Sequence, residues 1–185
     1  MTAPRLVLGL LACLSTAMPA LAADPIVIDF ETAVPLGADQ KANRFPRWEE
    51  KGVVFTLTHE PKQSKGKGLL MFFTHLATGH KGLVSALATE AIPVRATLPT
   101  PASEVTVTFW GSTVTPAILE AFDREGKLLH RATLPAPPPR NAPGDPVPFF
   151  PLTVKAANIA AIQFSGPRPG EFLAADELRI TPATQ

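Results

Sequence analysis

Short runs of alternating hydrophobic and polar residues follow one another along most of the chain after residue 25. In the segment 104–110, Val105, Val107 and Phe109 alternate with polar threonines and with Trp110. This two-residue period is typical of a strand with one buried face. Similar runs are rich in Val, Ile, Phe and Thr and are separated by turn residues. We therefore expect strands over 26–31, 52–59, 69–75, 94–98, 104–110, 117–122, 128–134, 149–154, 160–164 and 175–181.

A series of short strands of this kind predicts an all-β fold, a two-sheet antiparallel β-sandwich of the jelly-roll type. The composition agrees, since 21 prolines and 12 glycines suit a chain with many turns. Between the strands 117–122 and 128–134 we expect a hairpin, in which Asp123 hydrogen-bonds the turn backbone and Gly126 takes a positive φ. The segment 86–91 is the best candidate for a short helix, which Pro93 would end.

Proline is concentrated in one stretch, with eight residues between Pro135 and Pro151. Proline cannot donate a hydrogen bond to a sheet, so this stretch is not expected to form a central strand. We interpret 135–151 as a stiff loop of polyproline II conformation that joins two strands. The alternative is a recognition segment for an aromatic groove on a partner.

The first 22 residues have the pattern of a cleavable signal peptide. Arg5 supplies the positive start, an apolar stretch follows, and the small residues Ala20 and Ala22 flank Leu21 before the expected cleavage site. The apolar stretch is shorter than the ~20 residues of a membrane-spanning helix. The mature protein is then a single domain over 23–185, secreted or periplasmic. In the alternative, Cys13 is the lipid-bearing residue of a lipoprotein.

Cleavage after Ala22 also sets the charge and the cysteine chemistry of the mature domain. It removes Arg5, so the 17 basic residues fall to 16 and equal the 16 acidic residues. A neutral domain has no broad electrostatic attraction for nucleic acid. Cys13 is the only cysteine and is also removed, so disulfides and thiolate metal sites are excluded. A chain of this length can instead bury a core large enough to fold.

Several motifs together resemble galactose-binding-like jelly rolls, which occur in exported bacterial proteins of the PEP-CTERM type and in carbohydrate-binding modules. They are Ile-Asp-Phe-Glu at 28–31, Gly-Val-Val-Phe at 52–55, Ala-Phe-Asp at 121–123, Ile-Ala-Ala-Ile-Gln-Phe-Ser-Gly at 159–166 and Ala-Asp-Glu-Leu-Arg-Ile at 175–180. The sequence lacks the sorting tail of the PEP-CTERM type. The resemblance implies a sandwich whose first and last strands are neighbours, often with a structural calcium ion at their junction.

The residues themselves point to the same kind of site. Asp29 and Glu31 lie two apart on a predicted strand, so both carboxylates face one side. Alternation places Asp176 on the apolar side of the last strand, where a carboxylate is costly unless it is paired or binds a cation. Hard oxygen ligands suit Ca²⁺. Asp29, Glu31 and Asp176 are the candidate ligands. In the alternative, Asp176 caps a turn and the other two carboxylates are solvated.

Two tryptophans are candidates for ligand binding, because sugars stack on exposed aromatic faces. Trp48 lies in a polar setting that suits a loop, and Trp110 lies opposite the buried face of its strand. The alternative for both is packing inside the sandwich. His59, His75 and His80 follow no metal-binding spacing and are expected in exposed loops, although a zinc cluster is conceivable.

The sequence therefore predicts a secreted, non-catalytic binding module for a carbohydrate or a cell-envelope partner. The alternative is a small secreted hydrolase or lyase on the same scaffold, since a fold alone does not decide function. An exposed aromatic strip would favour the binding module. A cleft that joins one of the three histidines to carboxylates would favour the enzyme.

Overall fold

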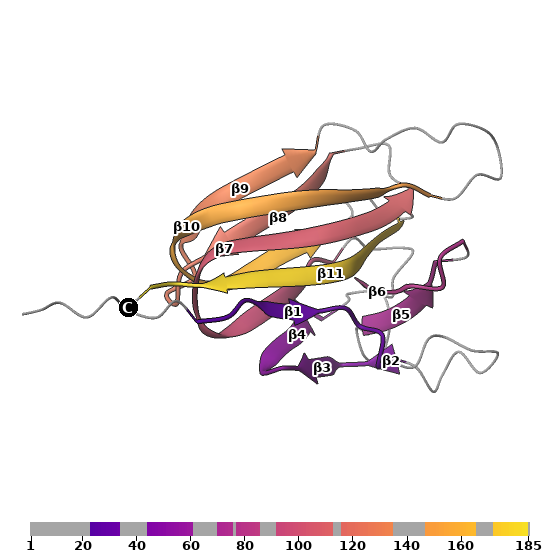
Figure 1. The fold of residues 1–185 in the computed structure, drawn as a ribbon, viewed down its shortest axis with the longest axis horizontal. Helices are drawn as coiled ribbons and strands as arrows, with labels where there is room; N and C mark the ends of the chain where they lie inside the picture. The colour runs from indigo at the N-terminus through magenta and orange to yellow at the C-terminus, as the bar shows by residue number, and fades with distance from the viewer. Residues whose placement is uncertain are drawn as a thin grey trace, which may run out of the picture.

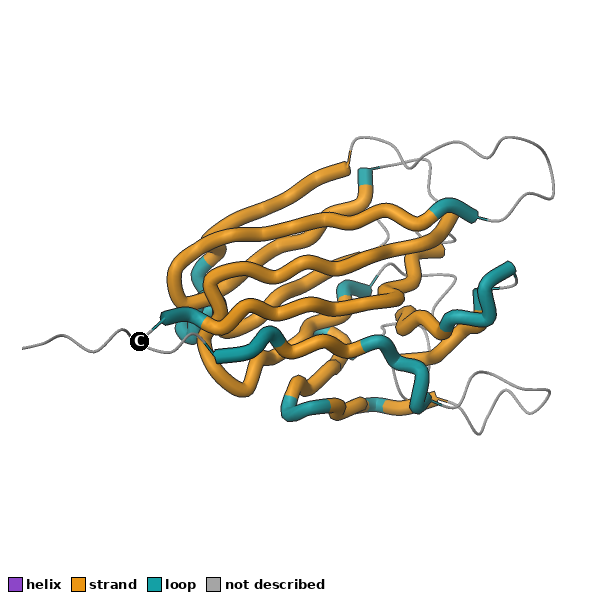
Figure 2. The backbone as a smooth tube through the Cα atoms, viewed as in Figure 1, coloured by secondary structure: helices purple, strands orange, loops and turns teal. Residues whose placement is uncertain are grey.

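A computed structural model describes residues 23–33, 44–60, 70–75, 77–85, 92–112, 116–134, 147–165 and 172–184. Within these ranges the chain is all-β with no helix, which confirms the predicted class (Figures 1 and 2). All strand pairs are antiparallel. The strands are β1 (Ile26–Ile28), β2 (Arg44–Phe45), β3 (Arg47–Glu50), β4 (Val53–Leu57), β5 (Leu70–Thr74), β6 (Lys81–Ser85), β7 (Val94–Ser112), β8 (Ala117–Phe122), β9 (Leu128–Leu134), β10 (Phe149–Ser165) and β11 (Phe172–Pro182).

Two long strands, β7 and β10, pair with each other along two separate stretches. The start of β7 pairs with the end of β10 over 94–97 and 161–164, and the rest of β7 pairs with the start of β10 over 104–110 and 149–155. Between these stretches the register shifts on both sides of Ile159, next to Asn158, whose φ is 61°. Irregularities of this kind bend a strand. The sequence predicted two strands in each case, whereas the structure has one long strand with a bend.

The bend divides the strands into two layers. One layer contains β4, the start of β7, the end of β10, β8 and β9, with β3 beside β4. The other contains β2, β5, β6, β11, the rest of β7 and the start of β10, with β1 beside β11. Side chains from both layers form one hydrophobic core, in which the ring of Phe109 lies 5.4 Å from that of Phe164. The predicted two-sheet antiparallel β-sandwich is confirmed.

The β8–β9 hairpin has both of its predicted strands with the predicted bounds. The Asp123 carboxylate accepts a hydrogen bond of 2.8 Å from the backbone N–H of Lys127, and Gly126 has a φ of 84°. The turn therefore uses the two residues that the sequence indicated.

Other strand bounds differ from the prediction for local reasons. The first strand ends at Ile28 instead of residue 31, because Phe30 adopts a left-handed φ of 57° that takes the chain out of the sheet. The strands β2, β3 and β6 were missed. β2 has only two residues, and the runs Arg-Trp-Glu-Glu of β3 and Lys-Gly-Leu-Val-Ser of β6 show no clear alternation of apolar and polar residues. Trp48 therefore lies on β3 and not on a loop.

The proline-rich loop is also shorter at its end than predicted, because β10 begins at Phe149 and includes Pro151. This part of β10 pairs with β7 alone among the described residues. Proline is tolerated there because an edge strand has one side that needs no donor. Residues 135–146 lie outside the described residues, as do the expected signal peptide, Cys13 and the expected helix over 86–91. In the described part of the chain, no helix could span a membrane.

A second, smaller hydrophobic cluster lies outside the main core. It is centred on Trp110 and contains Met71, Val84 and Ala174, with Phe73 and Phe149 packed against it. Gly82 lies directly beneath the indole. A methyl group at this position would come within 2.9 Å of Trp110 Nε1 and 2.8 Å of the Ala174 side chain. The cluster therefore depends on a glycine at position 82.

We expect the substitution Gly82→Ala to lower the free energy of unfolding by about 1–3 kcal/mol, because it overpacks this contact. The indole should also move, and tryptophan fluorescence in a Trp48→Phe background would report the change at Trp110 alone. Denaturant unfolding measures the loss of stability.

Gly79→Ala, in the loop before β6, is the matched control. Nothing lies within 4 Å of a methyl group there, and φ is 77°, so only the backbone cost of about 1–2 kcal/mol applies. Trp110 emission should stay unchanged in this control. Equal emission spectra for Gly82→Ala and its parent would contradict the packing described for Trp110.

Candidate functional site

Three segments that are far apart in the sequence line one open pocket of about 410 Å³. They are the turn after β1, the loop before β6 and the middle of β11, and we call their meeting point the acidic pocket. β11 lies between β7 and β1, so the first and last strands of the domain are neighbours (Figure 1). The residues that line the acidic pocket are Asp29, Glu31, Thr78, Gly79, His80, Asp176 and Glu177.

The turn after β1 places two of the carboxylates. Phe30 is fully buried and packs against Phe55, with 5.4 Å between ring centroids, whereas Asp29 and Glu31 on either side are exposed. The two carboxylates therefore lie on the opposite side from the core, as predicted. The backbone N–H of Glu31 donates a 3.2 Å hydrogen bond to Asp29 Oδ1, and a bond from the Ala33 N–H to the Phe30 carbonyl closes the turn.

Glu31 is also tied to β6. Its Oε1 accepts a hydrogen bond of 3.1 Å from the backbone N–H of Lys81, and the Lys81 ammonium donates to the Glu31 carbonyl. The loop before β6 closes with hydrogen bonds from the His75 N–H to the His80 carbonyl and from the Gly79 N–H to the His75 carbonyl. These contacts hold Thr78 and His80 beside the carboxylates.

Asp176 enters the pocket because β11 has a bulge at this residue. Ala175 pairs with Phe109 and Glu177 with the next residue back, Thr108, so Asp176 has no partner on β7. A bulge shifts the alternation of side chains by one position. Regular alternation would place Asp176 on the core face with Leu178; that expectation is wrong, since Asp176 lies at the acidic pocket with Glu177.

The Asp176 carboxylate is the least satisfied group of the pocket. The residue is 8% exposed, and Oδ1 is buried with no hydrogen-bond partner. Oδ2 lies 3.5 Å from His80 Nδ1, at the limit of a hydrogen bond. Burial raises the pKa of Asp176, the His80 contact opposes the rise, and the charges of Glu31 and Glu177 add to it. A buried carboxylate of this kind is costly in its charged form.

All three predicted calcium ligands thus line one pocket. A buried carboxylate oxygen without a partner and a donor set of carboxylates with one hydroxyl, that of Thr78, suit a hard cation such as Ca²⁺. However, within the described residues no group of three or more His, Cys, Asp or Glu side chains is arranged to hold a metal ion. Cation binding would therefore require these side chains to turn inward.

The three histidines do not form a cluster. His80 lies in the acidic pocket, whereas His59 is exposed and lies 3.1 Å from the Thr58 hydroxyl. His75 is only 3% exposed, so the expectation of an exposed loop histidine is wrong for this residue. Its ring packs against Trp110 and Phe149, and both ring nitrogens are engaged, Nε2 with the Val147 carbonyl and Nδ1 with the Thr78 hydroxyl.

Neither tryptophan is exposed in the structure. Trp110 lies on the outer side of its strand as predicted, but it is only 4% exposed in the second cluster. Trp48 is half-buried, and its ring lies 4.9 Å from that of Phe72 at the edge of the core. In the described part of the chain, the only exposed large hydrophobic side chain is Leu128. Both tryptophans are therefore packed inside the sandwich, which was the alternative to an exposed binding platform.

Three further residues of the acidic pocket, Thr78, His80 and Glu177, were not grouped with the carboxylates from the sequence. Glu177 follows Asp176 directly, but only the bulge brings both to one pocket. Thr78 and His80 lie almost a hundred residues before Asp176, and no local pattern links them.

The chain was compared with protein families, curated proteins and solved structures. No protein-family model and no curated protein matches the chain. Among solved structures, BiXyn10A CBM1 without ligand is 13% identical, with a TM-score of 0.43 over 85% of this chain and 97% of that chain. A mutant of CBM29-2, a family 29 carbohydrate-binding module, is 11% identical, with a TM-score of 0.38 over 71% and 94%.

A cleaved adhesin domain of Lys-gingipain from Porphyromonas gingivalis is also similar. It is 13% identical, with a TM-score of 0.41 over 87% of this chain and 99% of that chain. None of these scores is high enough to carry an argument about a ligand. The fold therefore stands on the strand pairing and the core described above, as an antiparallel β-sandwich.

Proposed function

We propose that this protein is a secreted, non-catalytic binding module for a carbohydrate or a cell-envelope partner, with a structural calcium ion at the acidic pocket. The observation that carries the proposal is the acidic pocket itself. Its volume of about 410 Å³ falls within the ~300–1,000 Å³ range of ligand pockets. Carboxylates, a hydroxyl and an imidazole line it, and such groups can read the hydroxyls of a sugar.

The proposal of a calcium ion depends on Asp176. Its Oδ1 is buried without a partner, and a cation would supply the missing interaction and remove the cost of the buried charge. Asp29 and Glu31 follow β1, and Asp176 belongs to β11, so an ion held by these side chains would join the first and last strands. Its role would then be to stabilise the domain.

A second candidate function, a hydrolase or lyase, is favoured by one observation. His80 lies beside a carboxylate in an open pocket, and general acid–base catalysis uses such pairs. The only hydroxyl among the residues that line the pocket is that of Thr78, which engages His75 and the N–H of His80. It is not placed as a nucleophile for His80, so we keep the binding module as the proposal.

The binding function can be tested with the mature protein, residues 23–185, on a glycan array with and without Ca²⁺. We expect saturable binding to at least one glycan, because the pocket has groups that recognise hydroxyls. A non-catalytic module should release no reducing sugar from that glycan. Binding of no glycan would contradict a carbohydrate ligand and favour a protein partner. Sugar release that is lost in His80→Ala would support the enzyme instead.

Secretion predicts the N-terminus of the mature protein. Mass spectrometry of the protein exported by its native host should show a chain that starts at Ala23, because Ala20 and Ala22 have the small side chains that signal peptidase accepts. A chain that starts at a lipidated Cys13 would contradict a soluble product and place the domain on a membrane anchor.

Calcium binding predicts a change in thermal stability. If Ca²⁺ binds the folded state alone, a Ca²⁺ concentration of about 100 times Kd raises the free energy of unfolding by about 2.7 kcal/mol. For a domain of this size, this corresponds to a rise in Tm of about 5–10 °C. Differential scanning fluorimetry in excess chelator and in excess Ca²⁺ measures the difference. Equal midpoints in the two conditions would remove the calcium site.

Asp176→Asn is the variant that tests the mechanism, with Asp24→Asn, an exposed carboxylate outside the pocket, as its control. Without the buried charge, Asp176→Asn should be more stable than the parent in chelator at pH 7 and should no longer respond to Ca²⁺. Because the pKa of Asp176 is raised by burial, the parent carries this cost once the pH exceeds that pKa. The gain in stability of Asp176→Asn over the parent should therefore disappear when the pH is below the ordinary pKa of an aspartate, because Asp176 is then protonated in both the folded and the unfolded parent.

A further inference from the structure

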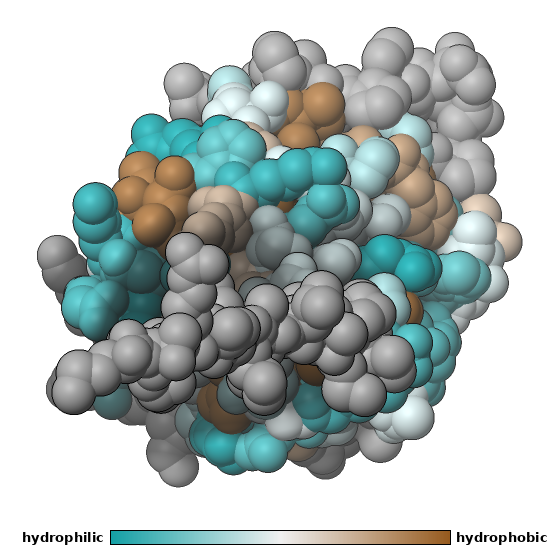
Figure 3. Space-filling view, turned by 60° about the vertical axis from the view of Figure 1, so that its left-hand side comes forward, coloured by the Kyte–Doolittle hydropathy of each residue, from teal (hydrophilic) through white to brown (hydrophobic). Residues whose placement is uncertain are grey.

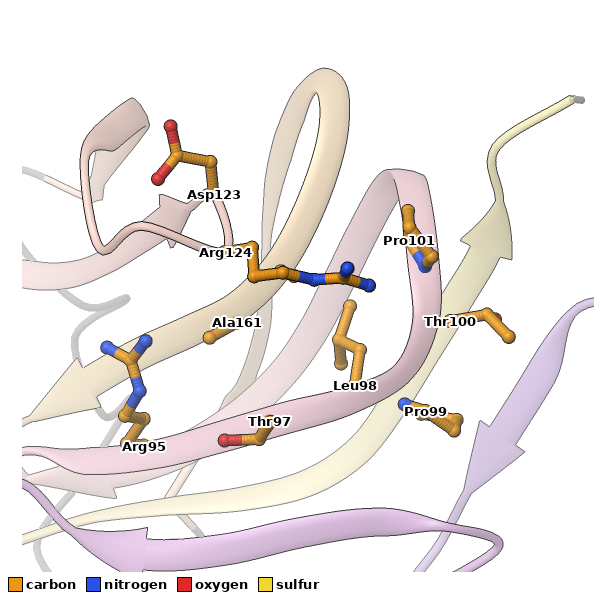
Figure 4. A pocket seen from close by; sticks show the side chains of 10 residues that line it. Arg95, Thr97, Leu98, Pro99, Thr100, Pro101, Asp123, Arg124 and Ala161 are labelled. Atoms are coloured by element: carbon orange, nitrogen blue, oxygen red, sulfur yellow. The ribbon is translucent and has the colours of Figure 1, made fainter.

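A second pocket lies at the bend of β7, in the layer that also contains β8 and β9. It has a volume of about 140 Å³ and is lined by residues 95 and 97–101 of β7, by Asp123 and Arg124 of the β8–β9 turn and by Ala160 and Ala161 of β10. We call it the arginine groove. In Figure 4, Arg124 extends over Leu98 towards Pro101, and Arg95 rises beside Ala161.

Both guanidinium groups of the groove lack an acidic partner in the described part of the chain. Arg95 lies 5.4 Å from the ring of Phe122 as a cation–π pair, and Arg124 makes no hydrogen bond, ion pair or ring contact with the described residues. The other arginines with described side chains are each paired: Arg47 with Glu49, Arg131 with Glu120 and Arg179 with Glu177. Two unpaired guanidinium groups that line one pocket are a site for an oxyanion, since their planar N–H donors match carboxylate and phosphate oxygens.

The surroundings favour a singly charged group on a sugar ring. Asp123 also lines the groove, so two positive charges and one negative charge leave a net charge of +1, which suits a monoanion better than a dianion. The exposed hydroxyls of Thr97 and Thr100 make no hydrogen bond with other described residues and can meet ring hydroxyls. Leu98 and Ala161, which are 8% and 1% exposed, form an apolar floor for the ring carbons.

We propose that the arginine groove binds the carboxylate of one uronic acid unit in an acidic polysaccharide. The inference rests on the proposed carbohydrate-binding function and names its ligand class, but it uses residues outside the acidic pocket. The groove is smaller than the ~300–1,000 Å³ of a typical ligand pocket, so it takes one unit of a chain and not a whole oligosaccharide. Arginine stays protonated at all relevant pH values, so binding should persist as long as the uronate is ionised.

The test compares two ligands that share a backbone, polygalacturonate and its fully methyl-esterified form. Isothermal titration at low and high salt should show binding of the acid and a loss of at least about tenfold in affinity for the ester. The affinity for the acid should also fall with salt, because the attraction is between charges. Inorganic phosphate is the third ligand, and millimolar phosphate should not displace the acid. Phosphate binding without polygalacturonate binding would overturn the assignment of a uronate.

Arg124→Gln should weaken polygalacturonate binding about tenfold, the size expected for one charge-assisted hydrogen bond, and Arg95→Gln should do the same. Arg95→Lys retains a cation over Phe122 but lacks the planar fork, so its affinity should fall between the parent and Arg95→Gln. Arg131→Gln removes an equal charge from an arginine outside the groove and should bind as the parent does. Unfolding midpoints confirm that each variant is folded.

The outcomes separate this inference from the broader proposal. Equal affinity for the acid and the ester, or unchanged binding in the double variant Arg95→Gln and Arg124→Gln, overturns the groove. If neutral glycans still bind on the array in that case, the binding module stands and only the groove fails. If no saccharide binds, the groove and the carbohydrate ligand both fail, and a protein of the cell envelope is left as the partner of the binding module.

Discussion

The sandwich depends on the antiparallel ladder between β7 and β10, which continues on both sides of the bend. Because these strands remain paired before and after the bend, one sheet can fold over and cover itself. The apolar residues of the two halves then face each other, as the contact between Phe109 and Phe164 shows. Burial of that apolar surface is the main source of stability in a domain that has no disulfide. The other strands add to the edges of this ladder, and their positions follow from it.

Most of the strands could be predicted because alternation is a local property of the sequence. The β8–β9 hairpin shows this best, since Asp123 and Gly126 specify the turn and the strands on both sides begin and end where expected. The bend in β7 and β10 could not be predicted in this way. Proline at 99 and 101 indicates a break in the pattern, but only the partner strand decides whether the chain ends a strand there or bends and continues.

The same distinction explains what was predicted of the acidic pocket. The alternation of Ile28 and Phe30 with Asp29 and Glu31 placed two carboxylates correctly, because that face is set by neighbours in the sequence. Asp176 was grouped with these carboxylates because regular alternation placed it on the apolar side of the last strand. It reaches the pocket through a bulge instead, and the bulge is visible only in the pairing of β11 with β7. The tryptophans failed as exposed platforms because their burial comes from other strands, such as the close approach of Gly82 to Trp110.

Both candidate sites lie where the regular ladder is interrupted, and there is a physical reason for this. In a regular two-layer sheet, one side of each strand faces the core and the other forms an even surface, so there is little depth in which to hold a ligand. The bulge at Asp176 sinks a carboxylate below that surface, and the bend of β7 brings the β8–β9 turn over it, so that Arg95 and Arg124 face one groove. Each irregularity also leaves charged atoms without their usual partner. At the bulge this is the buried Oδ1 of Asp176, and in the groove it is the two guanidinium groups. Opposite charges would satisfy the two sites, a cation in the acidic pocket and an anion in the groove. The two proposals therefore assign ligands of opposite charge to a domain whose own net charge is near zero.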